Sequence, residues 1–217
     1  MRFAIISDIH ANLPALQKTL KAIEQLRVQH IFCLGDIVGY GTEPQGVIDI
    51  IRTHKIPTVM GNHDETAMNP ELAYYMNPFA QAAINQHIRI LPPDDIRFLE
   101  SLPKYIKKDK LHLVHGIPPA SNWEYIHFQD EQELEQIFES FDAQIAFVGH
   151  THLFRYYEKM PESTVKTHNT LPKTLELQRN TKYVINCGTV GEPRPPENKA
   201  GFIIYDNERS IVQPFYF

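Results

Sequence analysis

The chain has 217 residues, a length typical of a single domain that buries its core without disulfide bonds or a structural metal. Hydrophobic residues make up 42% of it and charged residues 22%, and no apolar run is long enough to cross a membrane, so we expect a soluble globular protein. The net charge of -5 argues against nonspecific nucleic-acid binding, because neutralising phosphates requires concentrated Lys and Arg.

The N-terminus and the cysteines indicate where the protein works. Residues 1–7 lead directly into an apolar, strand-like run without the series of basic, apolar and small residues that marks an export signal, so we expect a cytoplasmic protein. The two cysteines, Cys33 and Cys187, each lie in an apolar strand-like segment. We therefore expect buried thiols rather than a disulfide bond.

Strands and helices alternate along the first part of the chain, which is typical of a parallel sheet covered by helices. Asn12 and Pro14 are the expected start of the first helix, which continues to Leu26 with leucines at helical spacing. The predicted elements are strands at 2–7, 30–34 and 56–60 and helices at 13–26 and 47–53.

The rest of the chain is predicted to be helical and then rich in strands. Residues 66–102 contain helix starts at Asn77 and Pro93 and are expected to cover the sheet. The polar segment 160–180 is predicted to be a hairpin or a mobile loop. The other predicted elements are a helix at 131–140 and strands at 111–114, 144–148, 183–187, 202–205 and 211–217. We see no repeat and no linker, and we expect residues 1–217 to form one domain.

Polar side chains follow five of the predicted strands. Because the carboxyl ends of parallel strands share one edge of a sheet, where ligands bind, we expect these segments to converge. The segments are "SDIH" (7–10), "GDIVGYG" (35–41), "GNHD" (61–64), "HG" (115–116) and "GHTH" (149–152).

The converging side chains have the chemistry of a metal site. Carboxylate, amide and imidazole groups without thiolates suit Mn²⁺, Fe²⁺ or Zn²⁺, and residues two apart in an extended chain project to the same side. The groups are too many for one tetrahedral ion and suit two ions that share a carboxylate and activate a bridging water. They are Asp8, His10, Asp36, Asn62, His115, His150 and His152.

Any one of these residues alone is more often a helix cap or a turn residue than a metal ligand. It is the order of five segments that favours a metal site. Other histidines lack this context, and we interpret them as surface or packing residues: His54, His87, His112, His127 and His168.

The five segments resemble the pattern of the calcineurin-like metallophosphoesterases: Asp-x-His, Gly-Asp, Gly-Asn-His-Asp/Glu, His and Gly-His-x-His, in this order. The resemblance extends from Asp8 to His152, about two thirds of the chain. It implies an α/β fold in which two packed mixed β-sheets are flanked by helices, a four-layer α/β/β/α sandwich whose second half is the strand-rich tail.

The resemblance also implies a role for each residue. One ion would be bound by Asp8, His10 and His152, the other by Asn62, His115 and His150, with Asp36 bridging them. His63 would contact a phosphoryl oxygen or protonate the leaving group, and Asp64 would orient the His63 imidazole and set its tautomer.

Two departures from the family pattern matter. Gly39 stands where a second Asp is common, so the supporting contact from that Asp is missing. The Arg-rich features of protein serine/threonine phosphatases are also absent, so a phosphoprotein substrate is disfavoured. The segments "GDIVGYG" and "NCGTVGEPR" (186–194) look like a small stand-alone bacterial branch related to phosphodiesterases and diadenosine tetraphosphate hydrolases. In that branch Arg194 would lie near the site, and the alternative is a solvated loop residue.

We therefore expect a metal-dependent phosphoric ester hydrolase that acts on small phosphodiesters or nucleotide-like esters by attack of a metal-bridging hydroxide, without a covalent intermediate. Its ions would be Mn²⁺ first, with Fe, Zn, Ni or Co as alternatives. Other hypotheses are a phosphomonoesterase, a dinucleoside polyphosphate hydrolase and a non-catalytic metal-binding scaffold. Segment 116–126 offers Trp123 and Tyr125 either to stack on a planar substrate group or to pack the loop onto the core. The expected partner is a small phosphate ester, and no oligomeric state is predicted.

Overall fold

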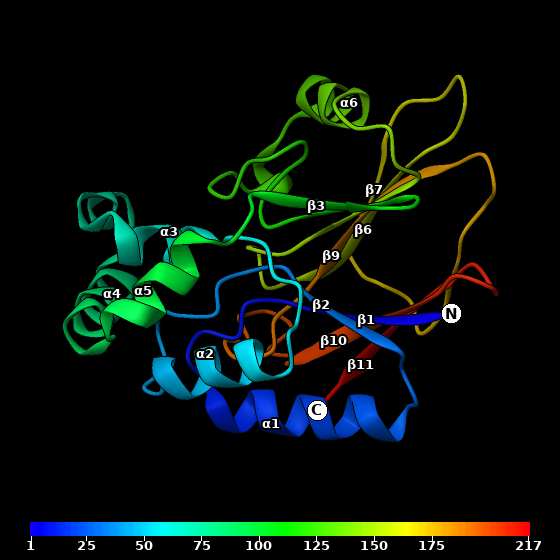
Figure 1. The fold of residues 1–217 in the computed structure, drawn as a ribbon. Helices are drawn as coiled ribbons and strands as arrows, with labels where there is room; N and C mark the ends of the chain where they lie inside the picture. The colour runs from blue at the N-terminus through cyan, green and yellow to red at the C-terminus, as the bar shows by residue number, and fades with distance from the viewer.

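Two β-sheets pack face to face in the computed structural model, which describes residues 1–217 (Figure 1). In the first sheet β1 and β2 are parallel and the other neighbours are antiparallel. Its order is β2 (His30–Cys33), β1 (Arg2–Ile6), β10 (Gly201–Asp206), β11 (Ile211–Tyr216) and β8 (Leu175–Glu176).

The second sheet is also mixed. Its central strands β4, β5 and β9 run parallel, and the strands at its sides are antiparallel to their neighbours. Its order is β3 (Tyr105–Lys108), β4 (Leu111–Val114), β5 (Ile145–Val148), β9 (Lys182–Cys187), β6 (Phe154–Lys159) and β7 (Lys166–His168).

Helices complete the fold, and none of them is both long and apolar enough to span a membrane. Asn12 caps the first helix as predicted, because its side chain accepts a hydrogen bond from Ala15 N at 3.1 Å. The helices are α1 (Leu13–Gln25), α2 (Pro44–Thr53), α3 (Asn62–Met68), α4 (Pro78–Ile90), α5 (Pro93–Glu100) and α6 (Glu131–Glu139), with short 3₁₀ helices η1 (Pro70–Tyr75) and η2 (Ile126–Phe128).

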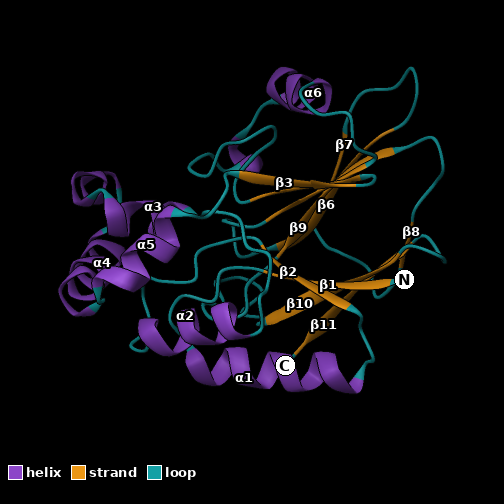
Figure 2. Ribbon diagram, in the orientation of Figure 1, coloured by secondary structure: helices purple, strands orange, loops and turns teal.

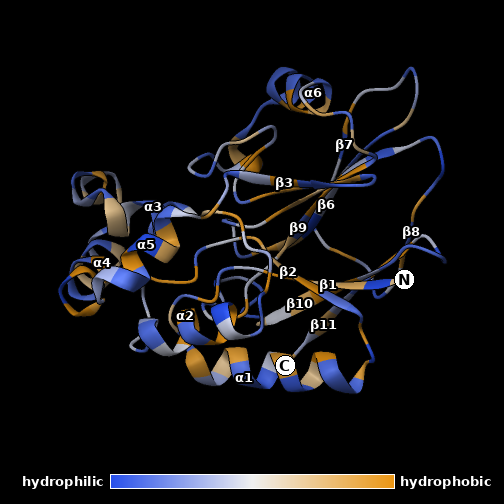
Figure 3. Cartoon of the chain, in the orientation of Figure 1, coloured by the Kyte–Doolittle hydropathy of each residue, from blue (hydrophilic) through white to orange (hydrophobic).

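Three apolar layers hold the sandwich together, and β1 shows how the sequence builds them. Ala4 and Ile6 face the helices α1 and α2, whereas Phe3 and Ile5 face the second sheet, as the alternation of side chains along a strand requires. A third cluster packs α6 onto the outer face of the second sheet. Figure 3 shows hydrophobic and hydrophilic residues alternating along α1, whose buried side chains Leu16 and Ile23 belong to the first layer. The predicted four-layer α/β/β/α sandwich is confirmed.

The structure corrects two predictions in the first half of the chain. Residues 56–60 form no strand, only a single parallel bridge between Thr58 and Cys33. Pro57 has no N–H to donate, and Met60 N turns away to Pro103 O, so pairing stops after one bridge. The helices of segment 66–102 do not cover a sheet. They pack mainly on one another and lie beside the sandwich (Figure 1).

The second half differs in smaller ways. Segment 160–180 forms the predicted hairpin, in which β7 pairs with β6, and then continues to β8 in the other sheet. Sequence analysis missed the edge strand β3, because its residues "YIKK" are mostly exposed and show no apolar alternation. Cys33 and Cys187 are buried free thiols, as expected.

Candidate metal centre

The predicted ligands meet where the strands of both sheets end. They follow β1, β2, β4 and β5, except Asn62, which opens α3 just after the bridged segment 56–60. Figure 2 shows the loops that carry them gathered between the strand ends and the helices α3–α5. All seven predicted ligands are buried, with at most 5% of any of them exposed. The structure therefore brings together every residue of the predicted set, whose role as ligands stays a prediction.

Most of these residues have a backbone conformation that is rare for residues other than glycine. Their φ angles lie between 51° and 65°, in the left-handed region, at Asp8, His10, Asp36, His150 and His152. Such a residue costs about 1–3 kcal/mol and persists only where surrounding contacts enforce it, a feature that clusters at functional sites. Here hydrogen bonds between the loops enforce it, for example from Asp8 N to Gly35 O at 3.1 Å and from His10 N to Asp36 O at 2.9 Å.

Three overlapping groups of potential ligands share this volume, and within each the ligand atoms lie within 4.8 Å of one another. Asp8, His10 and His152 form the first group, and Asp36, His115 and His150 form the second. The third, His10, Asp36 and His63, lies between them and shares one residue with each.

One carboxylate oxygen faces the first and the second group. Oδ2 of Asp36 lies 3.7 Å from His10 Nε2 in the first group and 3.3 Å from His115 Nε2 in the second. This position between the groups is the one that a bridging carboxylate requires.

Backbone carbonyls orient the imidazoles. Nδ1 of His10 lies 3.1 Å from Val38 O, and Nδ1 of His115 lies 2.7 Å from Leu34 O, so each Nδ1–H donates to a carbonyl and Nε2 is left facing the centre. His152 is held in the same way by Glu192 O at 2.5 Å. Hydrogen bonds of this kind fix the tautomer of a metal-binding histidine and raise its basicity.

The donor atoms fit divalent cations. Buried polar atoms almost always have a hydrogen-bond partner, yet Asp8 Oδ1, Asn62 Oδ1 and His115 Nε2 are buried with none. Asp8 Oδ1 belongs to one predicted ion site, and Asn62 Oδ1 and His115 Nε2 belong to the other. Oxygen and imidazole donors without thiolates match Mn²⁺, Fe²⁺ or Zn²⁺, and two cations would satisfy all three atoms.

The charges of the centre also suit cations. The neighbouring imidazoles lower the pKa of Asp8 and Asp36 despite the opposing effect of burial. Burial lowers the pKa of His63 to about 4 and of His150 to about 3. Burial opposes protonation of His115 as well, but the Asp36 carboxylate outweighs it and raises the pKa of His115 to about 9. At neutral pH the carboxylates are ionised and His150 is neutral, which are the forms that bind metal, whereas His115 would release a proton when an ion binds.

The prediction for Asp64 is wrong in its mechanism. The fully buried Asp64 carboxylate makes no hydrogen bond to the His63 ring, whose Nδ1 has no hydrogen-bond partner. It accepts hydrogen bonds at 2.8–3.3 Å from four backbone amides instead, those of Asp36, Ile37, Val38 and Gly61. Asp64 therefore holds the loop that carries Asp36 rather than orienting His63.

A cleft of about 220 Å³ opens beside the centre. Its lining includes His63, His150 and both aromatic residues expected there, Trp123 and Tyr125. The Tyr125 ring stacks on His150 with ring centroids 3.8 Å apart. Of the two interpretations of segment 116–126, the cleft wall is the one that the geometry favours.

Sequence analysis missed two aromatic residues of this cleft. Tyr40 packs its ring against His10 and His63, with ring centroids 4.8 and 5.1 Å away, and its position between two glycines in the Asp36 segment was a usable signal. Tyr75, on η1, carried no such signal. Arg194 lies near the site, since its Nη2 donates to the Tyr40 hydroxyl at 3.2 Å.

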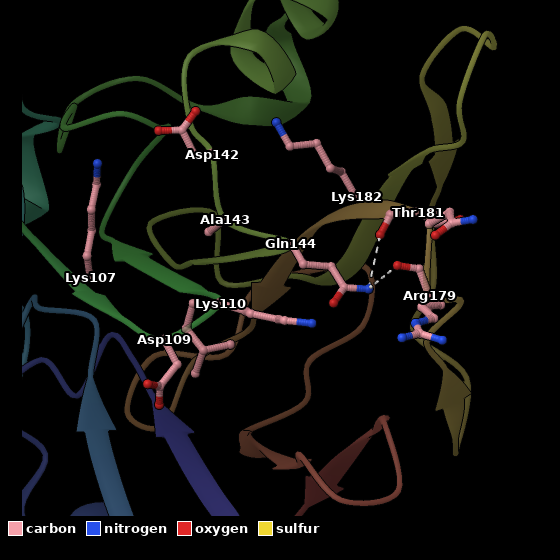
Figure 4. A pocket seen from close by; sticks show the side chains of 11 residues that line it. Lys107, Asp109, Lys110, Asp142, Ala143, Gln144, Arg179, Thr181 and Lys182 are labelled. Carbon is pink, nitrogen blue, oxygen red and sulfur yellow. Dashed lines mark hydrogen bonds between the residues drawn. The ribbon is translucent and has the colours of Figure 1, made fainter.

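A larger hollow, of about 460 Å³, lies at the opposite ends of β4, β5 and β9 (Figure 4). It contains none of the predicted site residues. Its basic side chains are partly committed elsewhere, because Lys182 donates to Phe138 O and Phe141 O at the end of α6. The chemistry therefore belongs to the smaller cleft.

Comparison with known proteins agrees with this geometry. The model of the calcineurin-like phosphoesterase superfamily domain matches residues 1–210, and the chain belongs to this family. An uncharacterized protein of Methanocaldococcus jannaschii is 36% identical over 210 residues, which span 94% of this chain and 82% of the relative.

Two solved structures are similar over nearly the whole chain. A metallophosphoesterase from Sphaerobacter thermophilus is 32% identical with a TM-score of 0.82, over 100% of this chain and 88% of the other. A hypothetical protein from Pyrococcus horikoshii is 20% identical with a TM-score of 0.76, over 99% and 87%. The family resemblance inferred from the five segments is thus confirmed, and the chain is a metallophosphoesterase by family and fold.

Proposed function

We propose that this chain is a phosphodiesterase that uses two divalent cations, with Mn²⁺ the first to test, to hydrolyse small phosphodiesters or nucleotide-like esters. The observation that carries the proposal is the position of Asp36 Oδ2, 3.7 Å from His10 Nε2 and 3.3 Å from His115 Nε2, between two groups of buried ligands.

The residues divide between two ion sites. Asp8, His10 and His152 would hold one ion, and Asn62, His115 and His150 the other, with Asp36 shared. Two divalent ions held there would supply an activated water and would neutralise charge on the phosphoryl oxygens. The buried hydroxyl of Ser7 is committed to Asp8 Oδ2 at 2.5 Å, which supports a reaction without a covalent enzyme intermediate.

His63 would act on the phosphoryl group in this proposal, as a proton donor to the leaving oxygen or, in the neutral form that its lowered pKa favours, as a hydrogen-bond donor to a phosphoryl oxygen. Its Nδ1 edge is closed by Gly39, since a side chain added at Gly39 would begin 2.1 Å from that nitrogen. The atom left to meet a substrate is therefore Nε2, which lies 3.9 Å from Asp36 Oδ2 beside both ligand groups. From there His63 would protonate the leaving oxygen or bind a phosphoryl oxygen.

The test is a substrate screen with protein depleted of metal and reloaded separately with Mn²⁺, Fe²⁺, Zn²⁺, Ni²⁺ or Co²⁺. We expect two bound ions per chain by elemental analysis, and faster turnover of phosphodiesters and cyclic nucleotides than of phosphomonoesters or dinucleoside polyphosphates. A preference for either of the last two classes would replace the phosphodiester assignment. Two bound ions without turnover of any ester would favour a scaffold.

Replacing His63 separates its two possible roles. We expect His63→Ala to retain both ions and to lower turnover by about 10²–10⁴-fold, the usual contribution of a positioned general acid. The loss should shrink for aryl phosphodiesters with more acidic leaving groups, which need no protonation. Measured kcat values across such a series decide the matter, since an equal loss for every leaving group would assign His63 to binding phosphoryl oxygens.

A further inference from the structure

The His63 imidazole has no hydrogen bond to hold its orientation. Nδ1 is buried without a partner, and Nε2 comes no closer than 3.9 Å to Asp36. Packing alone fixes the ring: Gly39 closes its Nδ1 edge, and the rings of Tyr40 and His10 lie with centroids 5.1 and 4.7 Å away. Two of these three neighbours belong to one short loop, residues 38–41. The position of that loop therefore decides the orientation of His63.

A histidine from α4 holds this loop at two points. The Gly39 N–H donates to His87 Nδ1 at 3.1 Å, and His87 Nε2 lies 2.9 Å from Gly41 O. Since Nδ1 accepts, Nε2 carries the proton and donates, which defines a neutral imidazole with one tautomer. Burial also lowers the pKa of His87, which keeps the ring neutral.

No other side chain hydrogen-bonds to the backbone of residues 39–41, although Gly41 N also donates to His10 O at 3.0 Å. Val38, at the start of the loop, is held by Asp64 at its N–H and by His10 at its carbonyl. Gly39 has a φ of +93°, and any side chain there would overlap the His63 ring. Only glycine therefore fits at this position of the loop. His87 is 1% exposed and has both ring nitrogens committed to the loop, an arrangement more specific than the filling of a core.

We infer that His87 is a positioning residue that sets the orientation of the catalytic imidazole: it fixes loop 38–41, and the loop holds the His63 ring, without contact between His87 and the substrate. This inference rests on the proposed proton role of His63. It gives His87 the role that the sequence assigned to Asp64, and it links the helices beside the sandwich to the metal centre.

The first test is the effect of three substitutions on kcat and KM of the metal-loaded protein. His87→Ala should lower kcat about 10–100-fold, the cost of misplacing a reacting group by about 1 Å, and leave KM and the content of two ions unchanged. His87→Asn keeps an acceptor near the position of Nδ1, and His87→Gln keeps a donor near the position of Nε2. The acceptor kept by His87→Asn is the one that holds Gly39, and Gly39 is the residue that contacts His63. His87→Asn should therefore restore more of kcat than His87→Gln.

A double substitution tests whether His87 acts through His63. In the His63→Ala background, His87→Ala should cause no further loss of kcat, because the ring that it positions is gone. Additive losses would overturn the inference. If His63→Ala itself left turnover unchanged, the proposed function of His63 would fail; if His63→Ala were slow and His87→Ala were as fast as wild type, only the role of His87 would fail.

The control is His112, a second buried histidine bonded to a backbone carbonyl, with Nε2 2.7 Å from Pro119 O. His112→Ala should lower the melting temperature about as much as His87→Ala but leave kcat unchanged. A readout without catalysis is the NMR signal of the His63 ring in metal-free protein, which should shift in His87→Ala and not in His112→Ala. Unshifted His63 signals in His87→Ala, or equal kcat losses in both variants, would reduce His87 to a structural residue.

Discussion

The two sheets contribute different chemistry to the metal centre. The loops after β1 and β2 of the first sheet supply two carboxylates, Asp8 and Asp36, whereas those after β4 and β5 of the second sheet supply only imidazoles. The negative charge that attracts cations thus comes from one sheet, and the second sheet adds imidazoles. Because ligands from both sheets meet, ions bound there would join the two halves of the sandwich.

Asp64 and Glu65 are consecutive in the sequence, but their carboxylates point in opposite directions. Asp64 points inward and holds the backbone of the loop after β2. Glu65 points outward, where it accepts hydrogen bonds from Lys104, just before β3, at 2.6 Å and, in the loop after β4, from Asn122 at 3.1 Å and Trp123 Nε1 at 2.7 Å. The Asp64 carboxylate therefore fixes the loop that carries Asp36, and the Glu65 carboxylate shapes the cleft wall. Substitutions in these two places should separate metal binding from substrate binding.

The largest effect is expected at Asp36, the charge that both proposed ion sites would share. Asp36→Asn should abolish binding of at least one ion, because a neutral amide bridges two cations poorly, and should lower turnover by more than the about 10–100-fold typical of residues that only support ligands. Elemental analysis and kcat measure this. Two tightly held ions in the variant would show that Asp36 is not the bridge.

Asp64 comes next, with an effect on stability. Asp64→Ala leaves four buried amides without their acceptor and should lower the free energy of unfolding by about 4 kcal/mol or more, because each buried amide left without a partner costs about 1–3 kcal/mol. For a protein of this size that is a fall of at least roughly 8 °C in Tm. Calorimetry of the metal-free protein measures it. An unchanged Tm would mean that the loop after β2 is held by its backbone alone.

The smallest effect is expected in the cleft wall, at Trp123. Trp123→Ala should raise KM for a nucleotide-like diester about tenfold, as loss of one stacking contact of about 1–3 kcal/mol implies, and leave a minimal aryl phosphodiester nearly unaffected. The matched variant Glu65→Gln keeps an acceptor for the indole N–H and should raise the same KM less. Equal losses for both substrates would make this loop structural and remove the support for a nucleotide-like ester.

The sequence predicted which side chains converge better than it predicted what holds them. Strand ends of a parallel sheet converge by geometry, so the five polar segments sufficed to locate His10 or His115. The partner of a buried side chain depends on packing between distant segments, which left no pattern: His87 sits on a helix 48 residues beyond Gly39 and was interpreted as a packing residue. Asp64 was misread because adjacency to His63 in sequence says nothing about direction, since successive residues of a helix point to different sides.

The passage of segment 160–180 from one sheet to the other has a consequence for how the protein behaves in concentrated solution. Its strands β7 and β8 are very short and occupy one edge of each sheet. At another edge β3 carries Lys107 and Lys108. Short edges and lysines on edges both discourage a second chain from adding a strand. Resistance to aggregation at these edges is thus a property of the polypeptide itself and does not depend on bound metal.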